Sequence, residues 1–317
     1  MINTSDLLHL PYTADLTEGG IAYALRSLPY LYNRIGGSAY DSLRRRVANA
    51  AVQLAFRRYL SEQEIPFEVK GAAPFIEHER YDVLLAGRRC DIQTFLISQR
   101  GQIEEMRHAP QVLLKAPALV ASDQHAGDGH SPYDLYLFAF VAAEVTPSAK
   151  LPHYMIHVMP EAWNRPRQWN PLGTLVLKSE SEEIQTLEIG GQDQGRVMRS
   201  FLIELPPQMR LEIQNGFFSL SYVHSQGSPN ARIGIRCSSF KETYLIGAQD
   251  WGNLWIDGMD IWLAGYMTRD EFSRRASFVP AGSHLFPYGS LHVKNLSVSV
   301  SELKPLAELF ERAKRSQ

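Results

Sequence analysis

The 317-residue sequence has few cysteines, no long apolar run and almost no net charge. Its two cysteines, Cys90 and Cys237, lie far apart, so neither a disulfide framework nor a cysteine-based zinc cluster has support, and we expect a reducing, cytoplasmic location. The longest uninterrupted apolar run, Leu135–Ala143, is about half as long as a segment that crosses a bilayer. The first residues also lack a basic stretch followed by an apolar one. We therefore expect a protein that neither spans a membrane nor is secreted.

The near-neutral charge limits how the chain can meet a polyanion. Lysine and arginine number 32 and aspartate and glutamate 34, which gives a formal net charge of −2. A protein that binds nucleic acid over its whole surface is normally basic, so any such site must be local. With 44% hydrophobic and 21% charged residues, the composition is otherwise that of an ordinary globular chain, without internal repeats or low-complexity segments.

Residues 1–151 have the pattern of a mixed α/β domain. Turn-forming residues before 41, among them Pro11, Gly19, Gly20 and Pro29, predict irregular structure with one short helix at most. Apolar residues at helical spacing then predict a helix over 42–60, capped by Asp41 or Ser42. Further along we expect a strand near 67–70, a hairpin over 81–97, a helix after 102 and a strand buried on both faces over 135–143.

Residues 152–256 differ in character from both ends of the chain. Short alternating runs separated by Gly, Pro, Asn and Ser predict an antiparallel sandwich or a small barrel. Over 257–317 the mixed pattern returns, with a strand at 261–267, a capping box at 268–271 and a final helix at 302–314. The predicted fold class is therefore α/β (α+β), with a core formed by both ends of the chain and an inserted β-rich domain over 152–256.

Three polar residues of the predicted hairpin carry the candidate chemistry. Asp91 and Gln93 are two positions apart, so their side chains leave the same face of a strand. An even-length turn brings Asp82 to that face, whereas a three-residue turn puts it on the opposite one. Two facing carboxylates repel unless a cation neutralises them, and Mg²⁺ takes one or two carboxylates together with waters and phosphate oxygens. The spacing predicts a Mg²⁺ (or Mn²⁺) site at Asp82 and Asp91, with Gln93 directed at the same water.

Asp82, the eight-residue gap and the run Asp91-Ile92-Gln93 resemble the PD-(D/E)XK motif of the restriction-endonuclease-like nuclease superfamily. The expected order of helix, strand, hairpin, helix and strand over 41–145 is also the order of that family's core, a mixed sheet flanked by helices. The resemblance implies metal-dependent hydrolysis of nucleic-acid phosphodiesters, and it favours DNA over RNA. It further implies a metal held by Asp82, Asp91 and the backbone carbonyl of Ile92, and a homodimer that cuts two strands.

The chain departs from this motif at several positions. Gln93 stands where the family has lysine, which removes a cation that would orient or activate water. No proline precedes Asp82. The predicted helix over 42–60 has no clear inward glutamate, for which Gln53 or Glu62 are the available substitutes.

Arginines on the predicted helix and hairpin are the candidate contacts to a nucleic-acid backbone. Arg46, Gln53 and Arg57 lie near one azimuth of the helix, and Arg88 and Arg89 lie at the hairpin tip. Such residues bind phosphate without reading a base sequence. The alternative interpretation is an ordinary solvated helix face, which Arg44, Arg45 and Arg58 also fit.

Other features leave further hypotheses open. Asp82 and Asp91 can also be two exposed acids paired with Arg80, Arg88 or Arg89. A polar loop offers His125, Asp128 and His130 as metal ligands, although Gly127 and Gly129 suit a plain turn. The five tryptophans are candidates for a ligand platform or for core packing: Trp163, Trp169, Trp251, Trp255 and Trp262. The competing functions are a non-catalytic nuclease-fold protein whose β-rich domain binds a polymer or protein partner, and an assembly component without activity.

Overall fold

A computed structural model describes residues 2–30, 38–69, 82–145, 153–227, 230–240 and 242–315. Helices and several sheets occur together, and the chain is a mixed α/β protein of the α+β kind. Contacts between residues divide it into two compact units. Unit 1 comprises 1–23, 32–145 and 256–317, and unit 2 comprises 24–31 and 146–255. The sequence pattern does not predict that 24–31 belong with the β-rich part of the chain. Arg80, Tyr81 and the predicted boundary at 151–152 lie outside the described residues.

Unit 1 is built on a six-stranded mixed sheet. Its strands, in spatial order, are β1 (Leu8–Leu10), β16 (Asp257–Thr268), β6 (Leu135–Glu144), β4 (Arg88–Ile97), β3 (Val83–Leu85) and β2 (Phe67–Glu68). Only β4 and β6 pair in parallel among these strands. Every residue of β6 except Glu144 is buried, which confirms the prediction of a strand covered on both faces.

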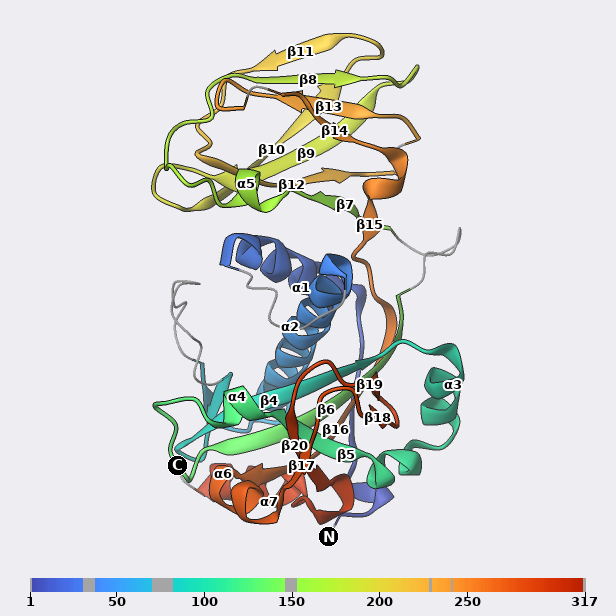
Figure 1. Ribbon diagram of the computed structural model, residues 1–317. Coiled ribbons are helices and arrows are strands. Elements are labelled where there is room, and N and C mark those ends of the chain that lie inside the picture. The colour runs from blue at the N-terminus through green and yellow to red at the C-terminus, as the bar shows by residue number, and fades with distance from the viewer. Residues whose placement is uncertain are drawn as a thin grey trace. The chain divides into compact units, whose positions relative to one another are not determined.

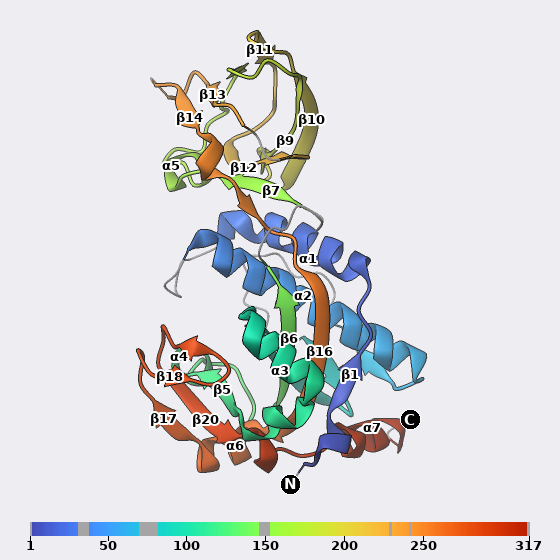
Figure 2. The same ribbon diagram turned by 90° about the vertical axis from the view of Figure 1, so that its right-hand side faces the viewer.

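The two faces of this sheet are covered differently (Figures 1 and 2). The long helix α2 (Ala39–Glu62) packs against β4 on one face. On the other face lies a three-stranded sheet of β17 (Ser277–Val279), β20 (Asn295–Ser299) and β5 (Pro117–Ala121). Helix α3 (Arg100–His108) and the 3₁₀ helix η3 (Pro110–Lys115) join that second layer. Phe138 and Phe140 of β6 are fully buried in the core between the sheets.

The N-terminal region corrects the prediction of irregular structure before residue 41. It holds η1 (Thr4–Asp6), β1, the 14-residue helix α1 (Ala14–Ser27) and η2 (Leu28–Tyr30). Gly19 and Gly20 suggested a turn, yet both lie inside α1. A Cβ on Gly20 would lie 2.5 Å from the carbonyl oxygen of Val47 in α2. Here glycine permits close helix packing, a need that sequence pattern alone does not reveal.

The helices predicted over 42–60, after 102 and over 302–314 are present with different ends, whereas helix α4 (Ser122–His125) lies in a segment predicted as a polar loop. The cap of α2 is Ser38, whose hydroxyl accepts from the Asp41 amide at 3.1 Å, so the predicted caps Asp41 and Ser42 are wrong. The predicted capping box is present, because Thr268 and Glu271 open α6 (Arg269–Arg275). Other short elements complete the unit: α4 (Ser122–His125), β18 (His284–Leu285), β19 (Gly289–Ser290), η5 (Val300–Glu302) and α7 (Leu306–Arg315).

Unit 2 contains two antiparallel sheets around one apolar core. The five-stranded sheet has the order β10 (Met198–Leu205), β9 (Gln185–Gln192), β12 (Ser219–Ser225), β7 (Met155–Val158) and β15 (Gly252–Asn253). The four-stranded sheet has the order β11 (Arg210–Ile213), β8 (Leu175–Ser179), β13 (Ile233–Arg236) and β14 (Tyr244–Ile246). Helix α5 (Glu161–Asn164) and η4 (Ala248–Asp250) are its short helices. This is a sandwich, the first of the two predicted architectures.

None of the helices in the described part of the chain has the length and apolar character needed to span a membrane.

Candidate functional site

The hairpin of β3 and β4 turns through two residues, Ala86 and Gly87. Both have positive φ angles, 49° and 69°, as a type I′ turn requires. The register pairs Val83 with Cys90 and Leu85 with Arg88. This is one of the even-length turns that the sequence allows, and it brings Asp82 beside the part of β4 that contains Asp91.

Asp82 is bound to the backbone of β4 at Ile92. Its amide donates to the carbonyl of Cys90 at 2.8 Å, and its Oδ2 accepts from the Ile92 amide at 2.6 Å. Because the N–H and C=O groups of one strand residue point to the same side, the Ile92 carbonyl faces the same edge. The carboxylate of Asp82 therefore lies against the backbone between Asp91 and Gln93.

Helix α2 contacts Asp82 through two side chains one turn apart. Gln53 Nε2 donates to Asp82 Oδ1 at 2.6 Å, and Arg57 Nη2 donates to the Asp82 carbonyl at 2.8 Å. Of the two residues predicted as substitutes for an inward glutamate, Gln53 thus contacts Asp82. Arg46 lies further back along the same helix and is half-buried, which lowers its pKa.

Asp91 is contacted from the other face of the sheet. Thr94 donates to Asn49 of α2 at 2.9 Å, and side chains alternate along a strand, so Asp91, Gln93 and Phe95 face away from α2. Gln124 Nε2 of α4 donates to Asp91 Oδ2 at 2.8 Å.

The two carboxylates are thus held by amides on opposite faces of the sheet, and the prediction that an even-length turn places Asp82 on the face of Asp91 is wrong. The Asp82 amide bonds to Cys90, which is also the partner of Val83, so the register shifts by one residue at Asp82.

The Asp91 carboxyl has an unusual titration. Burial raises its pKa to about 6, although hydrogen bonds from Gln124 and Gln93 and the charge of Arg269 oppose this rise. Asp134 adds to it by like-charge repulsion. A buried carboxyl with a raised pKa is ionised near neutral pH only at a cost in folding free energy. A bound cation would remove that cost.

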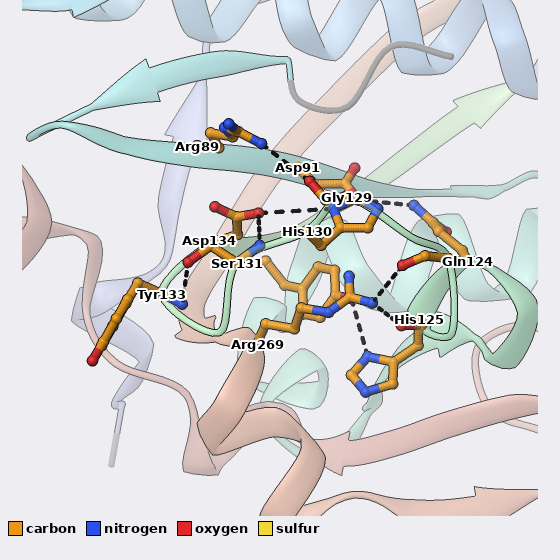
Figure 3. Close-up of polar contacts among 12 residues, drawn as sticks. Arg89, Asp91, Gln124, His125, Gly129, His130, Ser131, Tyr133, Asp134 and Arg269 are labelled. Atoms are coloured by element: carbon orange, nitrogen blue, oxygen red, sulfur yellow. Dashed lines mark hydrogen bonds and ion pairs between the residues drawn. The ribbon is translucent and has the colours of Figure 1, made fainter.

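Arg269, the first residue of α6, lies at the centre of the polar cluster beside Asp91 (Figure 3). Its Nη1 donates to the Tyr136 hydroxyl at 3.0 Å, and its Nη2 donates to the carbonyl of His125. The His125 ring bridges Tyr136 and Ser273, at 3.0 Å from Nδ1 and 2.8 Å from Nε2. Burial and the nearby Arg269 lower the pKa of His125. Sequence reasoning missed Arg269, because α6 reaches Asp91 only through the tertiary fold.

The loop before β6 does not bring its predicted ligands together. His125 is engaged as described, and His130 Nδ1 lies 3.8 Å from Asp134 Oδ2. Asp128 is exposed, and Arg89 Nη1 donates to the Gly129 carbonyl at 3.2 Å. Across the described ranges, no group of three or more His, Cys, Asp or Glu side chains is placed to hold a metal ion. Any cation at the hairpin would rely on two carboxylates, backbone oxygen and water.

The predicted arginines lie on different sides of the hairpin. Arg57 contacts Asp82 from α2, Arg89 lies by Gly129, and Arg88 follows the turn and is half-buried.

The tryptophans are divided between the two units. Trp163 stacks on Phe240 at 4.1 Å in unit 2, whereas Trp262 in unit 1 packs on His9 at 4.3 Å. The five tryptophans therefore do not form one platform.

A comparison with models of protein families, with curated proteins and with solved structures finds no match for this chain.

Proposed function

We propose that unit 1 is a restriction-endonuclease-like domain that hydrolyses nucleic-acid phosphodiesters, DNA first among them, with Mg²⁺ or Mn²⁺. The observation that carries this proposal is the hydrogen bond from the Ile92 amide to Asp82, which holds one acid of the motif against the backbone of the other. The order of elements supports it. Helix α2, strand β2, the β3–β4 hairpin, helix α3 and strand β6 follow the expected core order, with β5 added before β6.

The donor set fits a hard cation. Asp82, Asp91 and the carbonyl of Ile92 offer oxygen ligands only, and Mg²⁺ binds readily through one or two carboxylates with waters in its other positions. When bound, such a cation supplies a nucleophilic hydroxide and stabilises charge on the phosphate. Gln53 and Gln124 hold the two carboxylates from opposite faces of the sheet, so at least one of these hydrogen bonds must open and that carboxylate must turn before both acids share an ion.

The side chains around Asp91 divide the remaining tasks in this proposal. Gln93 is nearly buried, its amide bonds to Asp91, and it orients the attacking water. Arg269 supplies the positive charge that the motif lysine would otherwise bring. Arg46, Arg57, Arg88 and Arg89 contact the substrate backbone, so affinity should fall with salt.

Cleavage of supercoiled DNA, single-stranded DNA and RNA with Mg²⁺ or Mn²⁺ tests the proposal. Wild-type protein should cut at least one of them, and Asp91→Asn should abolish cutting, whereas Asp128→Asn, at an exposed aspartate of the neighbouring loop, should retain it. Activity should also decline as the pH falls through about 6, because protonated Asp91 is a poor cation ligand. If pure wild-type protein cuts no nucleic acid with either ion, the nuclease proposal is wrong.

A second candidate is a non-catalytic binding protein, and three observations favour it. Both hairpin carboxylates already accept hydrogen bonds from protein amides, and Gln93 replaces the motif lysine. Unit 2 also has a pocket of about 730 Å³ whose lining includes Arg165, Arg167, Gln168, Asn170 and Phe240. Its size is that of small-molecule sites. Salt-sensitive nucleic-acid binding without cleavage, unchanged in Asp91→Asn, would select this candidate.

A further inference from the structure

The pocket of about 730 Å³ in unit 2 lies between two segments that the sandwich holds together. Its lining comes from α5, from the segment 165–172 that follows α5, and from residues 239–240 beyond β13. The Ser238 hydroxyl donates to the Leu172 carbonyl at 3.1 Å, which joins the two segments. The Leu172 amide in turn donates to the Phe217 carbonyl at 2.8 Å. The walls of the pocket are therefore attached to each other and to the sandwich.

An aromatic ring forms part of the wall. Phe240 lines the pocket and stacks on Trp163, with ring centroids 4.1 Å apart and ring planes inclined by 16°. Trp163 is 4% exposed and belongs to the core of unit 2, so it fixes the position of the Phe240 ring. Because Trp163 covers one face of that ring, the other face is the surface that Phe240 offers to a ligand. A flat aromatic surface of this kind binds planar groups by stacking.

The charged side chains of the pocket are mainly basic. Arg165 and Arg167 are the cations among its lining residues, and Glu161 is the acid. Arg165 Nε donates to the Pro29 carbonyl at 2.7 Å, which anchors this guanidinium. Arg167 is exposed, and within the described part of the chain its side chain has no hydrogen bond or ion pair. A guanidinium of this kind is suited to a phosphate, which it binds through two parallel hydrogen bonds.

Two neighbouring amide side chains also line the pocket. Asn170 Nδ2 donates to Gln168 Oε1 at 3.4 Å, and the Asn170 amide donates to the Gln168 carbonyl at 3.1 Å. Gln168 Nε2 and Asn170 Oδ1 have no partner among the described residues. They leave one donor and one acceptor close together. Side-chain amides use such a pair to bind the polar edge of a nucleobase.

We propose that this pocket binds a nucleoside monophosphate. The base stacks on Phe240, its polar edge meets the two amides, and the phosphate binds Arg167. A neutral sugar would leave Arg167 without a counter-charge, and a sugar phosphate would leave the Phe240 ring uncovered, whereas a nucleotide satisfies both. The volume falls within the range of small-molecule sites. The lining residues and Trp163 all belong to unit 2, so the site is separate from the hairpin chemistry proposed for unit 1.

Calorimetric titration of the full chain with adenosine, guanosine, cytidine and uridine monophosphates tests the proposal. The buffer contains EDTA, so that no cation at the hairpin of unit 1 can hold the phosphate. At least one of the four nucleotides should bind. Its nucleoside and ribose phosphate should each bind at least about tenfold more weakly, because each lacks one of the two groups that the pocket holds.

Variants at the pocket locate the binding. Arg167→Ala should weaken nucleotide binding at least about tenfold, because it removes the charged partner of the phosphate. Phe240→Leu should weaken it at least about fivefold, whereas Phe240→Tyr keeps the ring and should retain the affinity. Arg210→Ala, at an exposed arginine of unit 2 outside the pocket, is the matched control and should bind as the wild type does. Circular dichroism confirms that each variant is folded.

Photo-cross-linking locates the site in the wild-type chain, where no variant has to fold. An azido derivative of the nucleotide that binds should label peptides within 161–172 or 238–240. The absence of binding by all four nucleotides up to ~1 mM overturns the proposal. It is also overturned by equal affinity for the nucleoside or for ribose phosphate, by labelling confined to other peptides, or by unchanged binding in folded Arg167→Ala or Phe240→Leu.

Discussion

Replacing Asp91 by asparagine should stabilise the protein at neutral pH. The carboxyl has its pKa raised from 3.8 to about 6 by burial, so the folded state binds its proton more tightly than the unfolded chain does. This difference corresponds to about 3 kcal/mol of destabilisation once the group is ionised in both states. Asp91 keeps some solvent contact, which reduces the expected effect to about 1–3 kcal/mol.

The effect has a definite pH dependence. Below about pH 4 the carboxyl is protonated in both states, so Asp91→Asn and wild type should differ little. Between about pH 4 and pH 6 the wild type loses stability relative to the variant, and above about pH 6 the difference is constant. Asparagine has nearly the same shape as aspartic acid and retains an oxygen that accepts from Gln124.

Urea denaturation in the absence of divalent ions, at pH 4.5 and pH 7.5, measures this difference. Asp128→Asn is the control, and its exposed position predicts a change within about 0.5 kcal/mol at both values. Equal stability of Asp91→Asn and wild type at pH 7.5, or a gain that is the same at both pH values, would refute the reasoning. Such a result would mean that Asp91 is better solvated or better paired than its surroundings indicate.

Three further variants test the packing and the turns. Ala86→Gly should stabilise by about 0.5–1 kcal/mol in urea denaturation, because Ala86 has a φ of 49°, which glycine adopts without strain; a loss would argue against the type I′ turn. Thr268→Ala should cost about 1 kcal/mol, since its hydroxyl accepts from the Glu271 amide at 3.2 Å, and Thr268→Ser should restore most of it. Phe138→Ala should cost about 3–5 kcal/mol in the same assay, because the ring is fully buried between the two sheets of unit 1; a cost below about 1 kcal/mol would contradict that placement.

Local sequence signals predicted the elements whose formation depends on their own residues. The nine buried residues of β6, the Thr268–Glu271 capping box and the β3–β4 hairpin all follow from hydrophobic pattern and turn chemistry. The same signals predicted most strands of the sandwich in unit 2. These features need little information from elsewhere in the chain, because periodicity and capping act over a few residues.

Glycine was the main source of error in the sequence-based predictions. Gly19 and Gly20 indicated a turn, and Gly190 and Gly191 obscured strand β9. In the structure, a Cβ on Gly190 would lie 2.1 Å from the Tyr222 ring, just as one on Gly20 would meet α2. These residues are small because another element packs against them, and that element is distant in sequence.

The candidate site shows the same division between sequence and tertiary structure. The sequence by itself determined that Asp82, Asp91 and Gln93 lie on one hairpin and that Asp91 and Gln93 share a face, since strand alternation is a local property. It did not determine the face of Asp82, because the shift of register at Cys90 is not visible in the residue pattern. Only the tertiary structure decided their environment. It brings Gln53 to Asp82 from α2, and Gln124 and Arg269 to the region of Asp91 from the opposite side. Burial and charge at a site depend on which elements pack around it, and a hairpin alone does not specify them.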